Sequence, residues 1–186
     1  LPQFQKSRSF DDAKARDGLR QILWGLFVKV VIADNLSKSV EHVFTSFREL
    51  GGLEIAVGIC LFGIQIYCDF SGYSLIARGT ARLLGFELMR NFAFPYFSRN
   101  IAEFWKRWHI SLSTWFRDYV YISLGGNRVA MTARLRNVLL TFAISGLWHG
   151  AGWNFLVWGM IHGICFMPLY IMGRNRQVSS IVAAGR

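Results

Sequence analysis

Cysteine is scarce in this chain, which has three cysteines in 186 residues. Cys60, Cys68 and Cys165 are far apart, none belongs to a CxxC pair, and each lies in an apolar stretch. A zinc site or a disulfide framework needs clustered or paired cysteines, so the sequence predicts neither. We expect buried free thiols, since an unreactive cysteine packs like a small apolar side chain.

Charge is scarce as well. Charged residues make up 17% of the chain against 53% apolar residues, and the mean hydropathy is +0.30. A soluble domain would have to hide nearly all of these side chains, whereas lipid covers them in a membrane protein. The net charge is +10, but nucleic-acid binders seldom carry long apolar runs beside their charge. We therefore expect membrane lipids as the surroundings and no nucleic-acid partner.

Several easily recognised motifs are missing. The chain has no GxSxG nucleophile elbow, no HExxH zinc motif and no Walker phosphate loop, and the sequence implies no metal. It contains no internal repeat and no low-complexity segment, and it begins without Met or a signal peptide. We interpret it as a fragment of a longer protein.

The apolar runs predict an all-α, multi-pass transmembrane bundle. Residues 53–77 and 153–172 are long enough to cross a bilayer, which takes about 20 residues. Residues 19–33 are shorter and favour an interfacial helix or a half-span, whereas residues 138–148 form the short first arm of a segment, 138–172, that is expected to enter the membrane and return. The second short run ends at residues 149–152, so we expect a broken or re-entrant helix there that lines a cavity.

The positive charge predicts an orientation. Residues 1–20, 78–136 and 173–186 are each net positive and are expected in the cytoplasm, whereas residues 34–52 are not and are expected outside. Gly125 and Gly126 mark a turn in the central segment.

Polar side chains inside apolar runs are candidates for function, because their burial in lipid is costly. Asp69 lies within residues 53–77 and needs a partner or water, so we expect it to face the protein interior. His162 is interpreted as forming an interhelical hydrogen bond rather than as a ligand, and His42 as a surface residue. His109 lies in an aromatic and cationic stretch, which taken alone favours a belt at the membrane interface.

His149 combines an ionisable side chain with a helix break. Gly150 and Gly152 follow it and would leave room for a substrate at the imidazole. Trp148 and Trp153 flank it and can wall a channel that excludes water. Imidazole accepts and returns a proton near neutral pH, as a general base must. A histidine that caps a helix end explains the pattern equally well.

A series of long motifs resembles the membrane-bound O-acyltransferase family. They are DFSGYS (69–74), FPY (94–96), EFWKRWHISLS (103–113), WFRDY (115–119), LGGNR (124–128), GLWHGAGWNF (146–155) and WGMIHG (158–163). The resemblance is dense over residues 62–163 and is most like the alginate O-acetyltransferase branch. Since family members are considerably longer, residues 1–186 are expected to be part of one such domain, without its N-terminal and C-terminal parts.

The resemblance implies an enzyme of the bacterial inner membrane with a pore-like cavity. Its reaction would transfer an acyl group, most simply acetyl, from acetyl-CoA or another thioester to a hydroxyl of an exported, alginate-like polysaccharide. The transfer would be direct or would pass through extracytoplasmic acetylation partner proteins. The thioester is a substrate, so no bound cofactor is expected. The alternatives are D-alanyl transfer to teichoic acid, acylation of a lipid or protein, and a non-catalytic transporter.

By the same resemblance His149 is the catalytic residue and His109 the second histidine of the site. His149 would deprotonate the hydroxyl, and His109 would orient a substrate or stabilise the oxyanion. Further candidates for substrate binding are Trp148, Trp153, Asn154, Asp69, Arg78, Arg82, Lys106 and Arg107. The basic residues among them would hold donor phosphates, unless their charge serves membrane topology alone.

Overall fold

A computed structural model describes residues 2–5 and 7–172. Residues 173–186, which were expected in the cytoplasm, lie outside the described residues. All regular secondary structure in the described part is helical, as predicted. The chain divides into two compact units, Leu1–Arg90 and Asn91–Arg186, and each is considered by itself.

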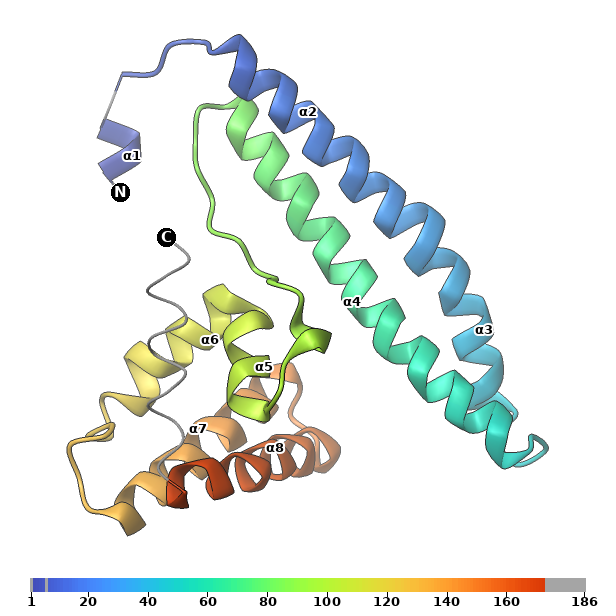
Figure 1. The fold of residues 1–186 in the computed structure, drawn as a ribbon, viewed down its shortest axis with the longest axis vertical. Coiled ribbons are helices and arrows are strands. Elements are labelled where there is room, and N and C mark those ends of the chain that lie inside the picture. Colours follow the sequence, from blue (N-terminus) through green and yellow to red (C-terminus); the bar gives the residue numbers. More distant parts are fainter. Residues whose placement is uncertain (1, 6, 173–186) are drawn as a thin grey trace. The chain divides into compact units, whose positions relative to one another are not determined.

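The first unit is built on two long helical segments that lie side by side (Figure 1). Asp11 begins the first segment, because its carboxylate accepts a hydrogen bond of 3.1 Å from the Lys14 backbone N–H. One segment consists of consecutive helices and the other of a single helix. The elements are α1 (Pro2–Gln5), α2 (Asp12–Leu26), the π-helix η1 (Phe27–Ala33), α3 (Asp34–Thr45) and α4 (Gly52–Leu83).

Glycines allow α2 and α4 to approach each other closely. A Cβ atom at Gly25 would lie 2.7 Å from the Gly72 carbonyl oxygen, and one at Gly72 would lie 2.8 Å from the Gly25 carbonyl oxygen. Gly18 and Gly79 face each other in the same way seven residues along each helix. Such small-residue contacts are typical of helix pairs in membranes, where packing rather than water drives association.

Two helices in the described part are long and apolar enough to cross a membrane, α4 and α8 (Trp153–Ile171). The 32 residues of α4 extend about 48 Å at about 1.5 Å per residue, so the predicted run of residues 53–77 is part of a longer helix. The run of residues 19–33 is not a separate short helix either. It lies within helical chain that continues from Asp12 to Thr45.

The expectation for the cysteines was partly wrong. All three are free, but only Cys68 is buried, whereas Cys60 and Cys165 are exposed. These two lie on α4 and α8, the candidate spans. A helix of this kind turns apolar side chains toward lipid as well as toward protein, so an apolar neighbourhood in the sequence does not require burial against the chain itself.

The second unit places short helices before a helical hairpin. The hairpin helices α7 and α8 lie side by side (Figure 1). A Cβ at Gly159 would lie 3.2 Å from the Gly146 Cα atom, so the two backbones touch there. The elements are η2 (Pro95–Phe97), α5 (Ile101–Arg107), α6 (Ile110–Phe116), the π-helix η3 (Arg117–Tyr121), α7 (Met131–His149) and α8 (Trp153–Ile171).

The connection between η3 and α7 contains the predicted turn. Gly125 and Gly126 have φ values of 100° and 53°, in the left-handed region that glycine adopts without strain. Asn137 on α7 is fully buried, and its side-chain amide donates a hydrogen bond of 2.7 Å to the Leu124 carbonyl. This bond fixes the turn against the hairpin, beside the cavity described next.

Candidate functional site

His109 lies in the tight turn between α5 and α6. The Asn91 carbonyl accepts a hydrogen bond of 2.9 Å from the Ile110 N–H, and the Asn91 side chain accepts one of 3.1 Å from the Ser111 N–H. The Ala93 N–H donates to the Arg107 carbonyl at 3.0 Å. The chain at residues 91–93 thus holds both sides of the turn and fixes the position of His109.

The backbone of His109 is strained. Its φ of 44° is left-handed, a conformation that costs about 1–3 kcal/mol for a residue other than glycine and is concentrated at functional sites. The neighbouring helix α5 is firmly anchored, because Asn100 caps it and the buried Glu103 pairs with Arg99 and Arg107 at 3.3 and 2.5 Å. The hydrogen bond from the Arg99 backbone N–H, followed by these ion pairs, lowers the pKa of Glu103.

His149 is the last residue of α7, as the predicted helix break requires. Its ring centroid lies 4.9 Å from that of Trp148 and 5.1 Å from that of Trp158. The glycines after it do not leave room for a substrate, contrary to the expectation from the sequence. The Phe155 ring fills the space beside Gly150, so access to His149 must come from another side.

That access is a cavity of about 590 Å³ within the second unit. Both His109 and His149 line it, together with side chains from α5, α6, η3, α7 and α8. Trp148 joins the two histidines, since its ring centroid lies 6.2 Å from that of His109. Burial, and then the neighbouring His149, lower the pKa of His109 to about 4. His109 is therefore a neutral imidazole at neutral pH, able to donate and to accept a hydrogen bond.

The sequence of the whole chain matches the family model described as the membrane-bound O-acyltransferase family over residues 2–186. The chain belongs to this family. It is 47% identical over 150 residues to the "Probable alginate O-acetylase AlgI" of Azotobacter vinelandii, a match covering 81% of this chain and 30% of that protein. Membership confirms the predicted fold class and makes this a membrane-bound acyltransferase fold.

Other relatives carry different names. The chain is 45% identical over 140 residues to the "Peptidoglycan O-acetyltransferase" of Helicobacter pylori, covering 75% of this chain and 27% of that protein. It is 37% identical over 111 residues to the "Teichoic acid D-alanyltransferase" of Streptococcus thermophilus, covering 56% and 27%. The chain thus spans less than a third of the length of each of these curated relatives.

The other predicted residues of the second unit have different surroundings from one another. Lys106 lines the cavity with the two histidines. Trp148 contacts both histidines but is 57% exposed. Trp153 is 82% exposed, and neither it nor the exposed Asn154 is among the residues that line the cavity. His162 is packed against Trp105 and Trp158 at 5.1 and 4.6 Å between ring centroids.

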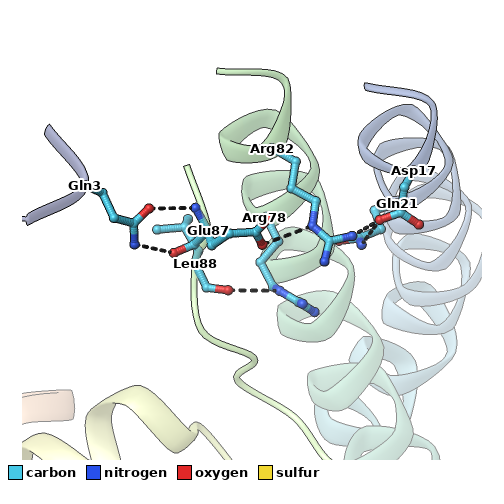
Figure 2. Close-up of polar contacts among 7 residues, drawn as sticks. All are labelled: Gln3, Asp17, Gln21, Arg78, Arg82, Glu87 and Leu88. Carbon is cyan, nitrogen blue, oxygen red and sulfur yellow. Dashed lines mark hydrogen bonds and ion pairs between the residues drawn. The ribbon is translucent and has the colours of Figure 1, made fainter. Parts of the chain in front are cut away.

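The candidates in the first unit form ion pairs and hydrogen bonds of their own. Figure 2 shows Arg82 between Asp17 and Glu87, and Arg78 beside Leu88. The Arg78 Nε atom donates to the Leu88 carbonyl at 3.4 Å. These contacts join α4 to α2 and to the chain that follows α4.

Asp69, predicted to require a partner, pairs with Lys29. The Lys29 Nζ atom lies 2.8 Å from Asp69 Oδ1 and 2.6 Å from Asp34 Oδ1. The partner comes from η1, whose residues were expected to belong to an interfacial helix or a half-span.

Sequence reasoning missed a polar group in the cavity wall. The Tyr121 hydroxyl donates a hydrogen bond of 2.8 Å to Asn127 Oδ1, and the Tyr170 hydroxyl donates one of 3.0 Å to the Tyr121 hydroxyl. Arg117 lines the same cavity. Arg117 and Asn127 lie in the motifs WFRDY and LGGNR, but no local pattern shows that the two motifs meet Tyr170 of α8.

Proposed function

We propose that this chain carries the acyl-transfer site of a larger enzyme that acetylates an exported, alginate-like polysaccharide. The observation that supports this most strongly is the meeting of His109, from the turn between α5 and α6, and His149, from the end of α7, in one cavity. The names of these relatives all describe the transfer of an acyl group. They differ in the acceptor, which is alginate, peptidoglycan or teichoic acid. The most similar of these three carries the alginate name.

In the proposed reaction His149 accepts the proton of the acceptor hydroxyl. The oxygen attacks the acyl carbonyl carbon, a C–O bond forms, and the C–S bond of the thioester breaks as the thiolate leaves with the proton from His149. His109, neutral at this pH, donates a hydrogen bond to the oxyanion that forms at the carbonyl. The half-buried position of His109 strengthens this hydrogen bond, because less water competes there, whereas His149 is exposed.

The donor in this proposal is acetyl-CoA or another acyl thioester reaching the site from the cytoplasm. The enzyme would be a multi-pass protein of the bacterial inner membrane, with residues 78–136 on the cytoplasmic side. The acetyl group would reach the polymer directly or through extracytoplasmic acetylation partner proteins. D-alanyl transfer to teichoic acid is the second candidate, favoured by the similarity to the Streptococcus thermophilus protein.

The test uses the full-length enzyme in proteoliposomes with radiolabelled acetyl-CoA and deacetylated alginate. His149→Gln keeps a polar side chain of similar size but takes up no proton at neutral pH, so transfer should fall by about 10²–10⁴-fold while thermal stability stays near wild type. His42→Gln is the matched control, because His42 lies on α3 and is not among the residues that line the cavity. Substantial transfer by a stably folded His149→Gln enzyme would remove the base assignment and favour the transporter.

A further inference from the structure

The cavity wall carries positive charge. Lys106 and Arg117 line it, and none of the described residues lining it is Asp or Glu. The lining is otherwise apolar, aromatic or neutral and polar, apart from the two histidines. Both side chains are exposed at this wall, so they are accessible to an anion, which two cations attract.

Lys106 differs from the neighbouring Arg107 in its partners. Arg107 is paired with the buried Glu103 at 2.5 Å, so its charge is compensated inside the protein. Within the described part of the chain, Lys106 forms no ion pair, and its charge is left for a ligand. Arg117 pairs with Asp118 at 2.7 Å. Of the two cations in the lining, Arg117 therefore has a carboxylate partner and Lys106 has none within the described residues.

The two side chains also act on each other. Partial burial, and then the charge of Arg117, lower the pKa of Lys106, and both side chains line the same cavity. An anion placed between them would offset this effect and accept hydrogen bonds from both. Arginine and lysine together bind phosphate well, since one offers a planar fork of donors and the other a mobile point charge.

We propose that Lys106 and Arg117 form an anion subsite that holds a phosphate group of the acyl thioester donor. This rests on the proposed function and extends it to the donor. The donor is favoured over a polymer carboxylate because a phosphate ester carries more charge to match two cations, and because residues 78–136 are expected on the cytoplasmic side. The nearby hydroxyls and amide of Tyr121, Tyr170 and Asn127 suit the uncharged amides of a pantetheine arm.

The test compares two donors with the full-length enzyme, acetyl-CoA and S-acetyl-N-acetylcysteamine, which carries no phosphate. Lys106→Gln should lower the ratio of kcat/KM for acetyl-CoA to kcat/KM for the short donor by about tenfold or more, the effect expected for one charge-assisted hydrogen bond. Lys106→Arg should restore the ratio. Arg117→Gln should act in the same direction, and Arg128→Gln, an exposed cation outside the lining, should not change it.

Several results would overturn the subsite. They are an equal loss with both donors, an unchanged ratio, or a rise confined to the KM for the polymer, which would assign the cations to an acceptor carboxylate. Binding of CoA alone, measured by calorimetry, separates this proposal from the proposed function. If the wild-type enzyme transfers from neither donor, the proposed function fails, and weaker CoA binding by Lys106→Gln than by Arg128→Gln still supports the subsite.

Discussion

The Lys29–Asp69 pair predicts an unequal response to two mutations. Lys29 serves two carboxylates, at 2.6 Å for Asp34 and 2.8 Å for Asp69. Asp69 lies near the middle of α4, a candidate span, whereas Asp34 is the first residue of α3. Removal of Asp69 leaves Lys29 with its second partner. Removal of Lys29 leaves Asp69 without its cation inside an apolar helix.

The magnitudes follow from these surroundings. Asp69→Leu should cost about 1 kcal/mol, the upper value for a partly exposed ion pair, since the Lys29 and Asp69 side chains are 36% and 51% exposed. Lys29→Met should cost about 3 kcal/mol, the penalty for an acidic side chain near the centre of a span. In the double variant that acid is gone, so Lys29→Met with Asp69→Leu should be about 2 kcal/mol more stable than Lys29→Met alone.

The assay is thermal unfolding of the full-length protein in detergent, followed by size-exclusion chromatography of the soluble fraction, with membrane yield as a second readout. Lys38→Met, which removes an exposed lysine from α3, is the matched control. The reasoning fails if Asp69→Leu is the more destabilised single variant, or if the double variant is as unstable as the sum of the two.

Three further changes test the packing and the site. Gly72→Ala should cost about 1–3 kcal/mol, because its Cβ would lie 2.8 Å from the Gly25 carbonyl oxygen, whereas Gly52→Ala has open space and should cost little; thermal unfolding compares them. Glu103→Gln should cost about 1–3 kcal/mol at pH 7. Since the pKa of Glu103 is lowered in the fold, wild type should lose this advantage as the pH falls below the ordinary value of 4.5, and equal stability at pH 7 would contradict the ion pairs. His109→Asn should fold, because Asn tolerates the left-handed backbone, and should transfer poorly, whereas His109→Val should be unstable as well; equal thermal stability of the two would argue against strain.

Local patterns predicted much of the fold. The apolar runs marked the candidate spans, and the glycines after His149 marked the end of α7, because helix length and helix breaks are set by neighbouring residues. The length of the first helical segment was not predicted. Residues 12–20 and 34–45, at its two ends, are polar, so their low hydropathy does not predict membrane helices. Both stretches are nevertheless helical, because α2 and α3 pack against α4.

The pairing of the two histidines could not be read from spacing. His109 and His149 are 40 positions apart, and their meeting depends on the left-handed turn at His109 and on the close approach of α7 and α8 at Gly146 and Gly159. The family resemblance predicted both as site residues, and the structure places both in the lining of one cavity. Physical reasoning on the chain alone ranked His109 as part of an interfacial belt.

The four basic candidates show what decides between topology and binding. All four carry one positive charge, so the sequence alone does not separate them. Their contacts with carboxylates differ. The Arg107–Glu103 pair is four residues apart on one helix and could have been predicted from the sequence. The Arg82–Asp17 pair joins two helices 65 positions apart and could not. Lys106 has no such partner within the described part of the chain and faces the cavity. Lys106 is also exposed, so its charge could serve membrane orientation as well, and the donor comparison proposed above is the measurement that separates the two roles.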